Sequence, residues 1–194
     1  MKITVVSFRR DRFLITTNRL VKNYKGVRLV FEPMTFNRGL TLVKGNNGSG
    51  KTTLLKALGG LVSVEGSYDI EGRAVYLPEK RTLPYWITPH AYLSTLAEIE
   101  EPQVTVERWL QAFNLHEKRL CSLGTLSNGM QQKVHLISVL MLDRAIYLLD
   151  EPFNALDRDS IKELLRFLKK RNRVIVCACH QVFDDMKGIR MITL

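Results

Sequence analysis

The sequence predicts an α/β protein in which a sheet with helices on its faces is interrupted by a helical insert. Two observations predict this class. Short apolar runs with strand character, such as 146–149 and 173–179, alternate with segments of helical periodicity, such as 161–168. From about Pro89 to Leu142 this alternation is replaced by successive helical segments. Three helices inserted into an α/β sheet are therefore the expected architecture.

The N-terminal part is expected to consist of short strands around one helix. Residues 2–8 and 13–17 have strand character, and 27–36 resembles a hairpin pair. An apolar run at 40–43 leads directly to Gly45. A helix is then expected over 52–58, ended by Gly59 and Gly60, and a strand over 74–77, ended by Pro78.

The helical insert is expected to begin where Thr88 and Pro89 fit an N-cap followed by proline at the first helical position. Further helices are expected over 104–113 and from Asn128 to Leu142. The strands at 146–149 and 173–179 then flank the amphipathic helix 161–168. We therefore expect a single domain, 1–194, with a core at approximately 1–84 and 143–194 and a helical subdomain at approximately 85–142.

Composition places the chain among globular proteins. It has 194 residues, of which 45% are hydrophobic and 25% charged, which argues against disorder. Three cysteines cannot form a disulfide framework and point to a reducing compartment. The sequence has no apolar window of spanning length and no signal-peptide pattern, so we expect a cytoplasmic chain. The net charge of +10 is compatible with a nucleic acid, an acidic membrane surface or a nucleotide as partner.

The phosphate loop, residues 45–52, fills every position of G-x-x-x-x-G-K-[ST] between an expected strand and an expected helix. Its glycines let backbone N–H groups turn toward phosphate oxygens, and the helix N-terminus adds positive potential. The Lys51 ammonium suits the β- and γ-phosphates, and the Thr52 hydroxyl suits Mg²⁺. The sequence therefore predicts a nucleoside triphosphate site formed by Gly45, Asn46, Asn47, Gly48, Ser49, Gly50, Lys51, Thr52 and Thr53.

An acidic pair, Asp150 and Glu151, follows the hydrophobic strand 146–149. Because the chain turns at the tip of a strand, both carboxylates can reach the phosphate site. We expect Asp150 to hold Mg²⁺ and Glu151 to orient and polarise the attacking water. The alternative is a strand that merely ends in two solvated acids. The intact phosphate loop in the same chain makes this alternative less favoured.

The signature segment, residues 126–133, reads Leu-Ser-Asn-Gly-Met-Gln-Gln-Lys. Together with Asp150-Glu151-Pro152, Asn154-Ala155-Leu156-Asp157 and His180 after a strand, it resembles the ATP-binding cassette (ABC) family, whose signature reads L-S-G-G-Q-Q-Q-R. Asn128 and Met130 depart from that pattern. The resemblance covers nearly the whole chain in the family's order and spacing. It implies a P-loop NTPase of ABC type, with a RecA-like core sheet, an N-terminal antiparallel β subdomain and an inserted α-helical subdomain.

The resemblance also implies how the residues act. ATP and Mg²⁺ are the implied ligands, and the signature acts in trans: one cassette caps the ATP that Lys51 of another cassette holds. A hydroxyl and backbone N–H groups at a helix N-terminus are suited to that contact. Two cassettes then sandwich two nucleotides head to tail, in an ATP-dependent pair. The implied site residues are Ser127, Asn128, Gly129 and Gln131 of the signature, His180 as the switch histidine and Asp157 of the D-loop.

Three positions leave alternatives open. Glu79, in Tyr76-Leu77-Pro78-Glu79, stands where the family has its Q-loop glutamine, and a carboxylate can still bind Mg²⁺. Tyr24 stands near the place of the aromatic residue that stacks on adenine, but it could equally be a packed tyrosine of a β-hairpin. The run Cys177-Ala178-Cys179-His180 suggests a metal site, although on a strand the two sulfurs share one face and His180 points to the other.

The resemblance implies the ATPase subunit of an ABC transporter, peripheral on the inner face of the cell membrane, which drives separate membrane permease chains. No nucleic acid partner is expected, and the Tyr76–Glu79 variant and the short chain favour export. Residues 83–87 would form a docking groove for a permease helix, or else core of the helical insert. The alternative function is a soluble ABC-type ATPase acting on DNA or ribosomes, which the basic run 169–173 supports.

Two family features count against that alternative. DNA-repair members insert long coiled coils between phosphate loop and signature, where this chain has 75 residues between Lys51 and Ser127. Translation-type members carry two cassettes in one chain, and this chain has one. A third possibility, a small-molecule kinase, is contradicted by the signature segment and by Glu151.

Overall fold

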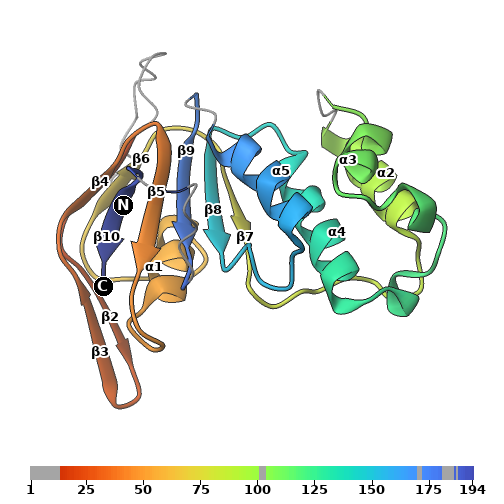
Figure 1. Cartoon of the computed structure of the whole chain (residues 1–194). Helices are drawn as coiled ribbons and strands as arrows, with labels where there is room; N and C mark the ends of the chain where they lie inside the picture. The colour runs from red at the N-terminus through yellow and green to blue at the C-terminus, as the bar shows by residue number, and fades with distance from the viewer. Residues whose placement is uncertain (1–13, 101–103, 170–171, 181–185, 187) are drawn as a thin grey trace.

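The computed structural model describes residues 14–100, 104–169, 172–180, 186 and 188–194 (Figure 1). Its centre is a five-stranded parallel sheet in the order β10-β5-β9-β8-β7. These strands are β5 (Gly39–Lys44), β7 (Ala74–Leu77), β8 (Ile146–Asp150), β9 (Val174–Ala178) and β10 (Arg190–Thr193). Because all five strands run the same way, the loops that follow them meet at one edge of the sheet.

The two faces of this sheet support two separate cores. Alternate residues of β8 and β9 point to opposite faces. Ile146, Leu148, Val174 and Val176 pack with Leu54, Leu55 and Leu58 of α1 (Lys51–Leu58). On the other face, Tyr147, Leu149, Ile175 and Cys177 join the larger core formed with the remaining helices. Strands buried on both faces explain why the sequence of β8 and β9 is continuously apolar.

An antiparallel subdomain covers the α1 side of the sheet. One part is a three-stranded sheet in the order β4-β1-β6, with β1 (Ile15–Thr17), β4 (Met34–Phe36) and β6 (Tyr68–Ile70). The other is the hairpin of β2 (Leu20–Tyr24) and β3 (Val27–Phe31), which projects beyond the rest of the molecule in Figure 1. The expected hairpin at 27–36 was therefore wrong: β3 pairs with β2, whereas β4 pairs with β1.

The helical part lies at one end of the sheet, beyond β7 (Figure 1). It contains α2 (Pro89–Glu100), α3 (Val106–Ala112), α4 (Asn128–Leu140) and two short 3₁₀ helices, His116–Lys118 and Leu123–Thr125. Helix α5 (Arg158–Leu168) packs on the same core as α4 and lies beside it in Figure 1. A side-chain oxygen caps the N-terminus of three of these helices: Thr105 for α3, Ser127 for α4 and Asp157 for α5.

The predicted fold class, an α/β core with an antiparallel β subdomain and an inserted helical part, is confirmed. The prediction missed β2, β6 and β10, and the expected strand at 2–8 lies outside the described residues. None of the helices in the described ranges is both long enough and apolar enough to cross a membrane.

Candidate functional site

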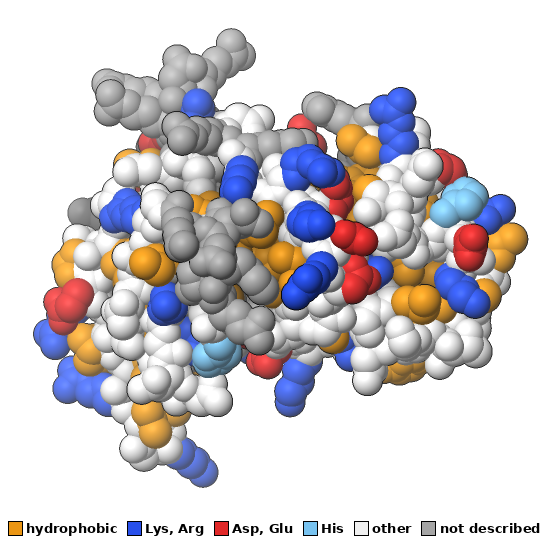
Figure 2. All heavy atoms as spheres, in the orientation of Figure 1, with side chains coloured by type: hydrophobic (Ala, Val, Ile, Leu, Met, Phe, Trp, Pro, Cys, Tyr) orange, Lys and Arg blue, Asp and Glu red, His pale blue; other side chains and the backbone are white. Residues whose placement is uncertain are grey.

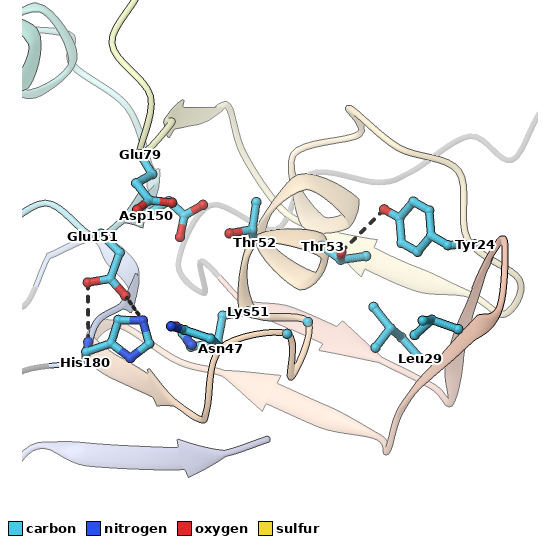
Figure 3. Close-up of a pocket in the computed structure, with 13 residues that line it drawn as sticks. Tyr24, Leu29, Asn47, Lys51, Thr52, Thr53, Glu79, Asp150, Glu151 and His180 are labelled. Carbon is cyan, nitrogen blue, oxygen red and sulfur yellow. Dashed lines mark hydrogen bonds and ion pairs between the residues drawn. The ribbon is translucent and has the colours of Figure 1, made fainter.

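A cavity of about 440 Å³ opens at the edge where the loops after β5 and β8 meet (Figure 3). The hairpin β2–β3 closes one side of it, and the start of α1 lies at its base. Most of the residues predicted to bind nucleotide or Mg²⁺ line this single cavity: Tyr24, Asn47, Gly48, Gly50, Lys51, Thr52, Thr53, Glu79, Asp150, Glu151 and His180.

The phosphate loop turns from β5 into α1 through two glycines with left-handed backbone angles. Gly48 has φ +83° and Gly50 has φ +99°, a region that other residues rarely occupy. A Cβ on Gly50 would also lie 3.1 Å from Leu29 Cδ1 and Phe31 Cε1. Within the described part of the chain no side chain caps α1, so the first N–H groups of this helix are available as donors for an anion.

Lys51 is nearly buried at the first position of α1, with 7% exposure. Its Nζ donates to the carbonyl of Gly45 at 2.8 Å and of Asn46 at 3.1 Å. These bonds hold the ammonium across the loop, within the cavity. A positive charge fixed beside free backbone N–H groups is suited to phosphate oxygens.

Asp150 is buried at the end of β8, and its two oxygens differ. Oδ2 accepts a hydrogen bond from the Tyr76 hydroxyl at 3.1 Å. Oδ1 is buried without a hydrogen-bond partner in the described part of the chain, which is costly unless a ligand satisfies it. Burial, and then the Asp150 charge, raise the pKa of Tyr76, so this hydroxyl remains a donor. Thr52 and Glu79 line the same cavity. Their side-chain oxygens and those of Asp150 fit Mg²⁺, which takes few protein ligands and completes its shell with phosphates and water.

Glu151 and His180 face each other at the next loop position (Figure 3). The backbone N–H of His180 donates to Glu151 Oε2 at 3.3 Å, and the His180 Nε2 lies 3.1 Å from Oε1. Burial raises the pKa of the Glu151 carboxyl, and His180 and Lys51 partly offset that effect. The backbone of Glu151 has φ +49°. This conformation is unfavourable for a non-glycine residue and is typical of functional turns.

Tyr24 lies at the hairpin side of the cavity with 46% of its surface exposed. Its hydroxyl is 3.4 Å from Thr53 Oγ1, and Lys22 Nζ is 5.5 Å from the ring centroid. Val27 and Leu29 form the adjoining apolar wall. Tyr24 therefore belongs to a β-hairpin, as one alternative expected, but its ring is open to the cavity.

The signature residues lie elsewhere, around the N-terminus of α4, and none of them lines the cavity. Ser127 caps α4 by accepting from Met130 N at 3.3 Å. Ser127 and Asn128 are exposed. Gly129 lies against the chain after Glu151: a Cβ there would be 2.7 Å from the Ala155 carbonyl oxygen. Gln131 is turned inward, and its Nε2 donates to the carbonyls of Leu123 and Leu126.

The cysteines near His180 are part of the core. Cys177 and Cys179 are buried on the same side of the sheet as Tyr147. Among the described residues, no three His, Cys, Asp or Glu side chains are grouped as a metal site would require.

A family model described as ABC transporter matches residues 34–154, which include the phosphate loop, the signature segment and the acidic pair. The chain belongs to the ABC transporter family. The Bacillus subtilis aliphatic sulfonates import ATP-binding protein SsuB is 32% identical over 193 residues, which cover 91% of this chain and 74% of that protein. An ABC transporter ATP-binding protein of Methanocaldococcus jannaschii is 29% identical over 147 residues, 71% of this chain and 56% of that protein.

The same ABC fold occurs in solved structures. One chain of the complex between archaeal ribosomal stalk protein aP1 and archaeal ribosome recycling factor aABCE1 matches with a TM-score of 0.80 and 26% identity. That match covers 100% of this chain and 39% of the other. This ABC subunit therefore corresponds to only part of some of its relatives.

Sequence reasoning missed several residues around this ABC site. Val27 and Leu29 of β3 and Tyr76 of β7 reach it because their strands are placed beside the phosphate loop and β8. Arg81 contacts the signature segment at Asn128. Lys133, the last residue of that segment, forms an ion pair with Asp157 of the D-loop. Strand alternation could have indicated that the Tyr76 side chain points into the protein, but no local sequence pattern identifies its partner Asp150.

Proposed function

We propose that this ABC subunit binds ATP with Mg²⁺ in the cavity and hydrolyses it, and that it does so to power transport through separate membrane permease chains. The observation that carries the proposal is the convergence of the phosphate loop, Asp150, Glu151 and His180 on one cavity. A cation held by backbone carbonyls beside free N–H donors is suited to phosphates. Glu151, a buried carboxylate directly after the last residue of β8, is placed to act on water.

Each group has a defined part in this proposal. Lys51 and the N–H groups of α1 hold the β- and γ-phosphates. Thr52, Glu79 and Asp150 hold Mg²⁺, which neutralises phosphate charge when bound. Glu151 orients the attacking water and polarises it, and His180, 3.1 Å from that carboxylate, contacts the γ-phosphate. Tyr24, with Val27 and Leu29 beside it, receives the adenine.

The signature residues complete the site of a second copy or of another cassette. This part of the proposal is supported by their position: Ser127 and Asn128 are exposed at a helix N-terminus and do not line the chain's own cavity. Each chain carries a net charge of +10. We therefore expect pairing to depend on nucleotide, whose negative charges offset the repulsion.

The test uses two variants that separate binding from turnover. Glu151→Gln should lose about 10²-fold or more in ATP turnover and should accumulate as an ATP-bound pair in size-exclusion chromatography. Lys51→Ala should weaken ATP binding about tenfold or more, since charge-assisted hydrogen bonds are lost. A Glu151→Gln protein that still hydrolysed ATP at the wild-type rate would remove Glu151 from the reaction. Unchanged ATP binding by Lys51→Ala would contradict the phosphate site.

A permease contact is supported by an exposed apolar surface on the helical part. Tyr85 is 55% exposed, Trp86 83% and Leu120 68%. Their segments lie side by side, because Leu123 N donates to the Ile87 carbonyl at 2.8 Å and His90 N to the Arg119 carbonyl at 3.0 Å. Leu83, in contrast, is in the core. Residues 83–87 are thus partly core and partly surface.

We expect this surface, Tyr85, Trp86 and Leu120, to bind a cytoplasmic helix of a permease at the inner face of the membrane. The membrane protein encoded beside this chain is the probe for co-purification. Trp86→Ala should lower its recovery several-fold. Ile99→Ala, at an apolar residue of α2 that is 71% exposed, should not. Equal recovery with both variants would place the contact elsewhere. No direction of transport is proposed, since SsuB is named an import protein whereas the Tyr76–Glu79 variant resembles exporters.

The alternative, an ABC-type ATPase acting on ribosomes or DNA, is favoured by the similarity to the complex that contains aABCE1. The charged residues that the structure describes on α5 and at Arg173 do not add to it. Basic and acidic side chains alternate over α5 in Figure 2, where Lys162 pairs with Asp159 and Arg166 with Glu163. Arg173, in the basic run 169–173, is paired with Asp143 at 2.8 Å. Co-sedimentation with ribosomes that survives physiological salt would favour this alternative.

A further inference from the structure

The segment 78–81, which follows β7, lies along one face of α4. Its contacts there are with Asn128, Gln132 and His135, which are spaced by four and three residues and therefore share a helix face. The His135 Nε2 is 3.1 Å from the Pro78 carbonyl oxygen. Because a carbonyl can only accept, the ring nitrogen is the donor. Burial lowers the pKa of this histidine, which keeps the ring in the neutral form.

Arg81 makes the remaining contacts of this segment with α4. One terminal nitrogen donates to the Asn128 carbonyl at 3.3 Å and to Gln132 Oε1 at 3.2 Å. The other terminal nitrogen donates to Asn128 Oδ1 at 3.4 Å. No carboxylate of the described residues forms an ion pair with Arg81, so its guanidinium is oriented by acceptors of α4 alone. The side chain is half-buried, which limits its freedom to leave them.

The same short segment carries a group of the nucleotide site. Glu79 stands between Pro78 and Arg81 and lines the cavity with Asp150. The contacts at either side of Glu79 are with the helix whose N-terminus carries Ser127 and Gly129. A shift of the segment when Glu79 gains or loses a ligand must therefore move α4 with it or break these hydrogen bonds.

Asn128 is the residue at which this chain departs from the glycine of the family signature. Glycine would keep the backbone carbonyl that Arg81 contacts, but it would remove the side-chain oxygen. The departure therefore adds an anchor point between the signature and segment 78–81.

We infer that Arg81 is a positioning residue. It fixes the surface formed by Ser127, Asn128 and Gly129 at the start of α4 in its position relative to Glu79 in the cavity, and Asn128 is its side-chain anchor. This inference rests on the proposed function, in which that surface completes the nucleotide site of a second cassette. It has an unusual consequence. Replacing Asn128 by the family's own glycine should weaken pairing rather than improve it.

The test is a double-mutant cycle with Arg81→Ala, Asn128→Gly and the combination, made in the Glu151→Gln background so that ATP-dependent pairing can be measured by sedimentation. Each single variant should weaken pairing about 3- to 10-fold, which is the range of one or two such contacts. The double variant should be no weaker than Arg81→Ala alone, because the two residues act through one interaction. Binding of ATP to single chains should change less than twofold.

Turnover and a matched control give the second measurement. With the native Glu151, Arg81→Ala should lower kcat at unchanged KM for ATP, whereas Arg81→Lys should recover part of the loss. Lys80→Ala removes the same charge one residue away, from an exposed side chain, and should behave as wild type. Independent effects that multiply in the double variant, or tighter pairing of Asn128→Gly, would overturn the inference. If the Glu151→Gln protein does not pair with ATP at all, the proposed function fails, and this inference fails with it.

Discussion

Lys133 and Asp157 form an ion pair, with 2.5 Å between Nζ and Oδ2, that joins α4 to the N-terminus of α5. The lysine side chain is 7% exposed and the aspartate 54%. The second aspartate oxygen accepts from the backbone N–H of Ser160 at 2.9 Å. One carboxylate thus neutralises a nearly buried cation and caps a helix, and it links the signature helix to the loop that begins at Glu151.

Asp157→Ala should lower the free energy of unfolding by about 2 kcal/mol, since a lost N-cap costs about 1 and an unpaired, nearly buried cation costs a similar amount. Asp157→Asn keeps a side-chain oxygen for the cap and loses only the charge, so it should cost about half as much. Urea denaturation of the three proteins measures both values. Equal losses for the two variants would show that the cap contributes nothing.

The ion pair also predicts a pH dependence. Burial raises the pKa of Asp157, but hydrogen bonds from Lys133 and Ser160 outweigh it and lower the pKa from 3.8 to about 2. A carboxyl whose pKa is lower in the folded protein stabilises the fold above its unfolded pKa, and this stabilisation is lost as pH falls toward the folded value. The stability difference between wild type and Asp157→Asn should therefore be constant from pH 7 to 5 and shrink between pH 4 and 2. A difference that is independent of pH would contradict the assignment.

Gly129→Ala should destabilise the protein by about 1–3 kcal/mol, the usual cost of overpacking. Its Cβ would lie 2.7 Å from the Ala155 carbonyl oxygen, a backbone atom that cannot move aside alone. Ala155 itself has φ +61°, so the loop there has little freedom to adjust. Urea denaturation again provides the measurement.

Gly59→Ala is the matched control for that variant. The residue is at the C-terminus of α1 with φ −79°, and a Cβ would be 3.4 Å from its nearest neighbour, the Leu55 carbonyl oxygen, which is an ordinary contact. Its stability should stay within about 0.5 kcal/mol of wild type. If both alanines cost the same, the close approach of Gly129 to Ala155 is not the cause.

The local parts of the site could be predicted from the sequence because each is continuous in the chain. The phosphate loop carries its own strand, turn and helix, and the acidic pair directly follows a buried strand. The short strands β2, β6 and β10 were missed because three to five residues carry too little periodicity to be distinguished from loops. The hairpin at 27–36 was misassigned for a related reason: two adjacent strands suggest a hairpin, whereas here each finds its partner elsewhere.

Contacts between distant segments could not be predicted in the same way. Tyr76 meets Asp150 because β7 pairs with β8, and Arg81 meets Asn128 because α4 packs beside β7. Neither partnership leaves a pattern in the sequence near either residue. For Gln131, agreement with the family signature does not reveal the role of the side chain. In the structure this side chain holds the loop before α4 by donating to two of its carbonyls.

Tyr76→Phe should raise the Mg²⁺ concentration needed for ATP binding about tenfold, in the range found for groups that orient metal ligands. The hydroxyl holds Asp150 Oδ2 at 3.1 Å, and Oδ1 has no hydrogen-bond partner among the described residues. Without that hydrogen bond the carboxylate can rotate. Titration with Mg²⁺ at fixed fluorescent ATP analogue measures the effect, and ATP binding without Mg²⁺ should be unchanged. A reduced affinity in the absence of Mg²⁺ as well would indicate a general disturbance of β7.

The turnover of ATP should fall as pH is lowered, with a midpoint above the ordinary glutamate range. Burial raises the pKa of Glu151, and only the ionised carboxylate can act as a base toward the attacking water. His180 lowers that pKa by its charge, so His180→Gln should move the acid limb of the kcat profile to higher pH, in addition to any loss in maximal kcat. Glu151→Gln should retain its stability near pH 8, where the buried wild-type carboxylate is charged and thus disfavoured. An acid limb that stays in place in His180→Gln would show that the pair, although 3.1 Å apart, is not coupled in the reaction.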